Sequence, residues 1–532
     1  MLKFLLCSVL LFAPLLQGIW NFKIQFAVSV LFFLFFSFLL VRSILAHTAA
    51  PFVISRENIP PICVLFLAFL SFLLSPVKTL IYHDLINFSI GIAVFYIALN
   101  ADKGSEKYFK ICLRVCAWFA ACLGAYQKFA LAEEALYSSF LNSNAFALFI
   151  LMMIPFAVSI KDYPLILLLA FNLVFTGSAA GFLSLAAVLW VFSVNPVRNP
   201  PCPKGTAAAP PMAGLISNGV KNSGKGRKWI LLLSAILILF AYFSAGFDLK
   251  SVYDRIIWWK SAFKMALDRP VAGFGTGSFL YIYPAYHAPV QWGTSSIYVH
   301  NYFLEFLSEN GFPAFAVWLF FLFSRFRQIE GWRKYSILAA LFHSVVDFGL
   351  ALPGIFWVFC YIIVPEPIPT PRVSNFSPMR ILLTRGVVKV MPAVFVIFCL
   401  MLAFISFSVK EFRASLALES ASKCRHRLWR GSAECGSQTG DVECVLQKIQ
   451  AVDSAGESPL ALNFLGDVYL DMAQSAKDRR LFFESAVCFE RLLLLNPYDS
   501  SAYFKLKLIY ETNGEQELKT ALLERRSKIF KW

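Results

Sequence analysis

Residues 254–313 read DRIIWWKSAFKMALDRPVAGFGTGSFLYIYPAYHAPVQWGTSSIYVHNYFLEFLSENGFP. This polar island separates apolar segments of membrane length. It contains an arginine, two adjacent tryptophans, three alternating glycines and a His-Asn pair that precedes the next apolar segment. The surrounding segments supply packing in lipid, whereas functional side chains gather on loops that a scaffold positions. We therefore expect the chemistry of this protein to lie in the island or to face it.

The composition of the 532-residue chain is that of a helical membrane protein. Hydrophobic residues make up 58% and charged residues 15%, whereas soluble domains average about 45–50% apolar and about 25% charged residues. The formal net charge of +16 invites a nucleic-acid interpretation. The basic residues fall mostly in short loops between apolar segments, which is the signal for membrane orientation. We therefore expect no nucleic-acid partner.

The hydrophobic pattern predicts an all-α fold, a polytopic transmembrane bundle of about thirteen spans, because a helix of about 20 apolar residues crosses a hydrocarbon core. We interpret the first apolar segment as an uncleaved span, since it lacks a small-x-small cleavage site and another apolar run follows it. The expected spans are 2–18, 22–42, 59–76, 80–99, 109–130, 141–160, 163–176, 177–194, 229–246, 302–324, 335–349, 350–364 and 390–409.

Basic loops alternate with neutral or acidic loops along this series, which predicts the orientation in the membrane. Loops such as 221–228 and 325–334 carry lysines and arginines and are expected in the cytoplasm, whereas the external loop 247–301 lies outside. Residues 195–228, rich in Pro, Gly, Ala and Lys, are expected to be a disordered cytoplasmic linker. The prediction is a multi-pass protein of the bacterial cytoplasmic (inner) membrane, with a cytoplasmic N-terminus and a periplasmic C-terminal domain.

The composition turns polar near residue 410, which divides the chain into a transmembrane domain, 1–409, and a small α-helical domain, 410–532. The second domain resembles tetratricopeptide helices. The residues that carry this resemblance are Leu465-Gly466, Tyr469, Ala486, Phe489, Asn496-Pro497, Ala502 and Tyr503. One hypothesis is that this tail binds a protein partner, and the alternative is a plain helical appendage.

The cysteines predict no metal site and one disulfide. Cys112 and Cys116 share a helix face, but no histidine or carboxylate joins them. In a periplasmic tail, Cys435 and Cys444 are the expected disulfide pair, because a polar stretch between them can turn back on itself. Cys488 is expected to fill the core of a helix pair. No Lys-Ser/Thr of a phosphate-binding loop follows the glycines, so we expect no nucleotide cofactor.

Several motifs follow one another in a fixed order. They are Arg255, Trp258-Trp259, Pro270-x-x-Gly273-x-Gly275-x-Gly277-x-Phe279, His300-Asn301-x-Phe303-Leu304-Glu305 and Glu309-x-Gly311-x-Pro313. This series resembles the bacterial O-antigen ligase and O-antigen polymerase family. The stretch FLNSN at 140–144 and the motif His343-Ser344-x-x-Asp347-Phe348 agree, and the resemblance covers roughly residues 60–365. One departure is Ala179, which stands where the family often carries an arginine.

The resemblance implies a glycosyltransferase that moves a glycan from undecaprenyl diphosphate to an acceptor hydroxyl at the outer face of the membrane, without a metal or nucleotide. The implied partners are the lipid-linked glycan, a glycan or lipid acceptor, and the membrane. Ligase, polymerase and transferase onto protein remain open. A hypothesis from another class is a non-enzymatic transporter or assembly scaffold for cell-surface polysaccharide.

Two residues are the expected catalytic pair. A guanidinium fork fits phosphate oxygens, so Arg255 is the candidate for holding the diphosphate; the alternative is an interfacial anchor paired with Asp254. A neutral imidazole, with an unperturbed pKa of about 6.5, takes a hydroxyl proton, which is the role expected of His300. The further candidates for substrate binding are Arg269 and Lys260 as a second cation, Trp259 for stacking on sugar, and His287.

The remaining motif residues have structural interpretations. The alternating glycines 273, 275 and 277 predict a turn with positive φ angles that aims the loop back at the membrane. Asn301 is expected to cap the helix that follows it. His343 and Asp347 are four residues apart within one expected span, and we expect them to pair with each other, because ionisable groups in a membrane are costly when alone.

Overall fold

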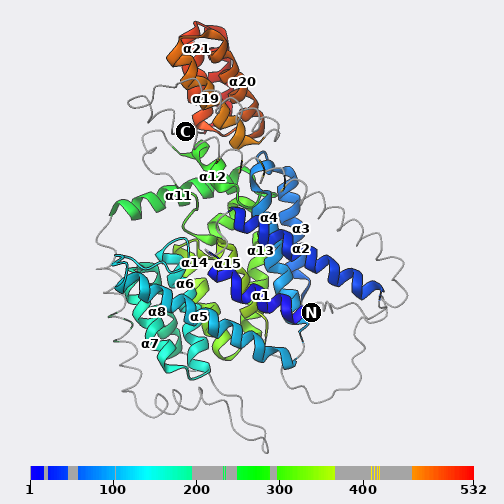
Figure 1. The fold of residues 1–532 in the computed structure, drawn as a ribbon, viewed down its shortest axis with the longest axis vertical. Helices are drawn as coiled ribbons and strands as arrows, with labels where there is room; N and C mark the ends of the chain where they lie inside the picture. Colours follow the sequence, from blue (N-terminus) through cyan, green and yellow to red (C-terminus); the bar gives the residue numbers. More distant parts are fainter. Residues whose placement is uncertain are drawn as a thin grey trace, which may run out of the picture.

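The computed structural model describes residues 2–16, 22–45, 58–101, 103–194, 249–287, 296–365 and 458–531, with seven isolated positions between 232 and 419. Within these ranges every regular element is a helix (Figure 1), so the predicted all-α class is confirmed for the described residues. The predicted linker 195–228 and the cysteines 424, 435 and 444 lie outside the described residues. The predicted spans 229–246 and 390–409 are described only at single positions.

Each predicted span in the described ranges coincides with a helix. The helices are α1 (Leu2–Leu15), α2 (Phe22–Leu45), α3 (Pro60–Leu74), α4 (Lys78–Leu99), α5 (Glu106–Phe129), α6 (Ser143–Ser159), α7 (Tyr163–Phe175), α8 (Ala179–Val194), α13 (Tyr302–Gln328), α14 (Gly331–Val346) and α15 (Pro353–Ile362), with the 3-10 turns η3 (Lys103–Ser105) and η6 (Gly349–Ala351). By length and composition, α4, α5 and α13 are each able to cross a membrane, and most of the others are shorter apolar helices. The total of thirteen spans stays a prediction.

The bundle core is built around α4, which packs against α15 and α3. The ring of Phe88 stacks on Phe356 with centroids 5.3 Å apart and meets the edge of Trp318 at 6.0 Å. Gly91 allows this close approach of α4 and α15, because a Cβ there would collide with the Phe356 ring. Aromatic rings in such arrangements contribute more than their buried area alone.

Basic residues gather at one end of the bundle. Arg333 at the start of α14 donates to Glu106 Oε1 at 2.7 Å and to the Tyr361 carbonyl at 2.9 Å. These bonds bring together the start of α5, the start of α14 and the end of α15. At the opposite end, Ser178 and Asn144 join the starts of α8 and α6 to Asp347, which follows α14. The helix directions therefore agree with the alternation that the loop charges predict, while the orientation in the membrane stays a prediction.

The external loop forms α11 (Leu249–Asp268), α12 (Phe279–Ile282) and the 3-10 turn η4 (Tyr283–Tyr286). Figure 1 shows this region, in green, between the helical bundle and the orange-to-red tail. The tail consists of α19 (Pro459–Ala476), α20 (Arg479–Leu495), α21 (Ser500–Asn513) and α22 (Gln516–Ile529). Gly466 packs directly under the Phe489 ring. Cys488 is buried in the tail, as predicted.

The tail is docked on the external loop. The backbone N–H of Lys531 donates to the Ala285 carbonyl at 2.7 Å, and the Lys531 ammonium pairs with the Asp268 carboxylate. The Tyr498 ring meets the edge of Phe274 at 6.2 Å. The tail therefore lies on the same side of the bundle as the loop, which is the side that carries His300.

Candidate active site

His300 is held at the mouth of α13 by its own backbone and by its neighbour. Its φ of 55° is in the left-handed region, which residues other than glycine seldom adopt. Asn301 is the N-cap of α13, and its side-chain oxygen accepts from the Leu304 N–H at 3.0 Å, so the predicted cap is confirmed. Backbone strain of this kind clusters at functional sites, where the surroundings enforce it.

Aromatic rings fix the plane of the imidazole. Trp258 stacks on His300 with centroids 5.2 Å apart and an interplanar angle of 22°, and Phe348 meets the ring edge-on at 4.8 Å. The Trp259 indole N–H donates to the His300 carbonyl at 3.3 Å. The His300 side chain keeps 20% of its surface exposed. The ring is thus oriented by protein on its faces and still open to a ligand.

A buried carboxylate stands behind this imidazole. Asp347 is fully buried, and its Oδ2 lies 3.6 Å from His300 Nδ1. The same oxygen accepts from Asn144 Nδ2 at 2.7 Å, and Oδ1 accepts from the Phe348 N–H at 2.7 Å. Asn144 Oδ1 in turn accepts from the Ser178 hydroxyl at 2.7 Å. The 3.6 Å separation is slightly longer than a hydrogen bond, and such contacts often tighten when substrate binds.

The predicted pairing of His343 with Asp347 is not seen as a hydrogen bond. Asp347 contacts Asn144 and His300 instead. Asp347 has φ −149° and ψ 172°, so it leaves the helical path after α14 and turns toward α6 and His300. It stays near enough to His343 for an electrostatic interaction. His343 is fully buried, and neither ring nitrogen has a hydrogen-bond partner among the described residues.

Arg255, on α11, is half-buried and makes no hydrogen bond or ion pair in the described part of the chain. The alternative of a pair with Asp254 is therefore not seen. The guanidinium is close enough to His343 to interact with it electrostatically. An unpaired guanidinium at the end of the bundle that carries His300 has donors available to an anionic ligand.

The other predicted binding residues are more scattered. Trp259 lies against the backbone of His300. Arg269 donates to the Leu74 carbonyl at 3.1 Å and covers the Phe274 ring at 4.7 Å. His287 is buried beside the Tyr283 ring, with centroids 6.0 Å apart, and Lys260 has an exposed side chain. These placements bring Trp259 to His300 but show no contact of Arg269, His287 or Lys260 with it within the described ranges.

The glycine motif wraps a break in α13. Gly273, Gly275 and Gly277 have positive φ angles, as predicted. Gly311 interrupts α13 with φ 76° and ψ 171°. A Cβ at Gly273 would collide with the backbone of Glu309, and a Cβ at Gly311 would collide with that of Val271. The Gly275 N–H donates to the Glu309 carbonyl at 2.7 Å, and the Phe312 N–H to the Pro270 carbonyl at 2.8 Å. The motif thus fixes the loop to the helix that follows His300.

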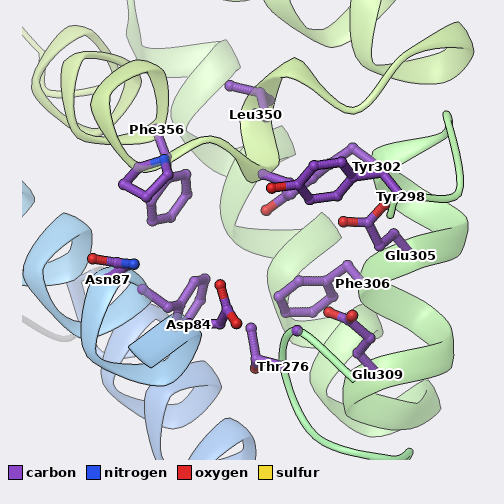
Figure 2. A pocket seen from close by; sticks show the side chains of 14 residues that line it. Asp84, Asn87, Thr276, Tyr298, Tyr302, Glu305, Phe306, Glu309, Leu350 and Phe356 are labelled. Atoms are coloured by element: carbon purple, nitrogen blue, oxygen red, sulfur yellow. The ribbon is translucent and has the colours of Figure 1, made fainter. Parts of the chain in front are cut away.

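A small pocket of about 60 Å³ lies between α4 and the first turns of α13 (Figure 2). Tyr298 and Phe348, stacked at 4.2 Å, separate it from His300. Glu309 Oε1 accepts from the Phe279 N–H at 3.1 Å, and Glu305 Oε2 from the Val299 N–H at 2.9 Å. The lining residues are Asp84, Asn87, Phe88, Thr276, Gly277, Tyr298, Tyr302, Glu305, Phe306, Glu309, Leu350, Ala351, Pro353 and Phe356.

Neither this pocket nor the Ser178–Asn144–Asp347 connection is predicted from the sequence. The available signal was polar residues inside apolar segments: Asp84 and Asn87 in one span, Glu305 and Glu309 in another. Burial raises the pKa of the Tyr298 hydroxyl well above its usual range, and the charge of Asp84 adds to this effect. Tyr298 therefore stays protonated at the pocket wall. Across the described residues, no group of three His, Cys, Asp or Glu side chains is arranged to hold a metal ion.

Residues 164–319 match the family model described as O-Antigen ligase. This segment contains α8, α11, the glycine motif, His300 and the first part of α13. No curated protein matches the chain.

Proposed function

We propose that this chain, which matches the O-antigen ligase family model over residues 164–319, transfers or polymerises a glycan at the outer face of the cytoplasmic membrane. The family points in general to glycan transfer of the O-antigen ligase type, on membrane-associated glycan and lipid substrates. The finer proposal is an undecaprenyl-diphosphate-linked donor, an acceptor hydroxyl and a reaction without a metal. In this proposal residues 1–409 form the catalytic membrane domain and the tail 410–532 a periplasmic appendage.

The observation that carries the proposal is the His300–Asp347 pair. A carboxylate next to Nδ1 favours the tautomer with its proton on that nitrogen, which leaves the Nε2 lone pair available. His300 Nε2 then accepts the proton of the acceptor hydroxyl as the hydroxyl oxygen attacks the anomeric carbon. The bond from that carbon to the diphosphate oxygen breaks, and the diphosphate leaves with the bonding electrons. Asp347 stabilises the imidazolium that results.

Arg255 supports the departure of the diphosphate. Its guanidinium has no protein partner in the described ranges, so its donors are available to phosphate oxygens. The expected second arginine is replaced by Ala179, which directly follows the Ser178 of the Asp347 network. The replacement of the expected arginine by Ala179 therefore falls at the candidate site itself. In the proposal Arg255 carries most of the charge stabilisation, and Arg269 and Lys260 remain candidates for the second cation.

The second candidate function is a non-enzymatic transporter or assembly scaffold. What favours it is the docked helical tail, a platform on which a protein partner could assemble. A deletion strain carrying wild type, His300→Ala or Lys264→Ala distinguishes the two. If the protein is an enzyme, His300→Ala leaves surface glycan unligated or short while the lipid-linked precursor accumulates, and Lys264→Ala, an exposed change on α11, restores the wild-type profile. Full complementation by His300→Ala rejects the enzyme proposal.

A further inference from the structure

The pocket in Figure 2 is lined by acidic side chains. Asp84, Glu305 and Glu309 line it, and no lysine, arginine or histidine does so in the described part of the chain. Glu305 and Glu309 are each held by a backbone N–H. Asp84 makes no hydrogen bond or ion pair among the described residues, so its carboxylate is available to the pocket. Carboxyl groups gathered in a low-dielectric interior are neutralised either by protons or by a bound cation.

A second observation, independent of the carboxylates, points to a ligand. Asn87 is only 5% exposed and lines the pocket, yet neither its Oδ1 nor its Nδ2 has a hydrogen-bond partner in the described ranges. Buried side-chain amides are nearly always hydrogen bonded, because an unmade bond is unfavourable. Asp84 and Asn87 are three residues apart on α4 and so share a helix face. Both residues line the same small space.

Size and chemistry restrict the ligand. A cavity of about 10–15 Å³ is enough for one water molecule. The pocket of about 60 Å³ therefore holds a few water-sized groups and excludes a sugar. The polar atoms are almost all oxygens, which hard cations prefer. Because no three acidic or histidine side chains in the described residues can hold a metal ion together, a divalent or transition metal is disfavoured. A monovalent cation that keeps part of its water shell fits both the volume and the oxygen-rich lining.

We propose that this pocket binds an alkali cation, Na⁺ or K⁺. The proposed ligands are the Asp84 carboxylate, the Asn87 amide oxygen and the Glu305 carboxyl group. The ion ties α4 to the first turns of α13, directly behind the Tyr298–Phe348 stack that borders His300. Divalent-metal chelators do not remove such an ion. Binding at this site is independent of whether the neighbouring site transfers glycan.

The test is thermal unfolding of the purified full chain in detergent, at fixed pH and ionic strength. Sodium or potassium chloride replaces choline chloride, whose cation is too bulky for the pocket. A ligand that binds only the folded state raises Tm with the logarithm of its concentration above Kd, so we expect a rise of at least about 2 °C with Na⁺ or K⁺. The rise in Tm should disappear in Asp84→Asn and Asn87→Leu. It should persist in Glu134→Gln, which removes an exposed charge that does not line the pocket.

Two results would overturn the proposal. If the wild-type Tm is the same in choline, sodium and potassium salts, no alkali cation binds, and this measurement does not depend on any variant folding. If the Na⁺ or K⁺ effect survives in Asp84→Asn or Asn87→Leu, the cation binds elsewhere. Should Asp84→Asn fail to fold, Asn87→Leu carries the comparison alone, since it removes an amide without altering charge.

Discussion

The Oδ2 atom of Asp347 lies 3.6 Å from Nδ1 of His300, across the junction between the end of α14 and the start of α13. Asn144 and Ser178 hold the carboxylate from two further helices. Four helix ends therefore determine where one imidazole points. Such a supporting set of hydrogen bonds is what gives a catalytic base a fixed orientation and tautomer.

His300→Ala should lower the rate of glycan transfer by about 10²–10⁴-fold, the usual contribution of a general base. Asp347→Asn should keep substrate binding but lower kcat, because the amide no longer favours the proton on Nδ1. The measurement is in vitro transfer with separate kcat and KM. A change confined to KM for Asp347→Asn would contradict a role in orienting the base.

Arg255→Ala should slow transfer by about 10²-fold or more, and Arg255→Lys should be nearly as slow, because an ammonium does not reproduce the guanidinium fork. The matched control is Lys264→Ala, which removes a cation from an exposed position on the same helix. Initial rates of transfer are compared at saturating acceptor. Wild-type rates for both Arg255 variants would remove it from the site.

Gly273→Ala and Gly311→Ala should each lower the Tm and the activity together. Both positions have positive φ angles, and an added Cβ would meet backbone rather than a movable side chain. An alanine at positive φ alone costs about 1 kcal/mol, and the collision adds to this. Gly104→Ala is the control, since nothing lies within 4 Å of its added Cβ. Equal Tm values for Gly104→Ala and Gly273→Ala would contradict the close approach.

Docking of the tail should depend on the charge of Asp268. Burial raises the pKa of this carboxyl, but hydrogen bonds from Lys531 and Tyr286 outweigh burial and lower it. The stabilisation is therefore fully present above the unfolded pKa, about 3.9, and is lost as the pH falls through the lower folded value. The Tm difference between wild type and Asp268→Asn should stay constant from pH 7 to about 4 and shrink below it. Glu517→Gln, an exposed change on α22, should show no such difference.

The predicted orientation is tested with reporter fusions. Fusions after Lys228 and Lys389 should behave as cytoplasmic, because these positions end basic loops. Fusions near Gly293 and after Arg430 should behave as exported. The tail contacts Asp268 and Ala285 of the external loop. The fusions near Gly293 and after Arg430 must therefore report the same side of the membrane. A cytoplasmic result at Gly293 would reject both the topology and the placement of the site.

The sequence by itself determined the helices and pointed to the region of the candidate site. Runs of about 20 apolar residues specify helices in lipid, since backbone groups must bond within the segment, and the Asn301 cap and the positive φ of the three glycines follow from local chemistry. Only the tertiary structure decided which side chains meet. Periodicity placed Asp347 on the face of His343, but α14 ends at Val346, and the extended backbone of Asp347 turns the carboxylate to Asn144 and His300. The acidic pocket likewise requires α4 and α13 to pack together, a contact between segments far apart in the chain that no local pattern encodes.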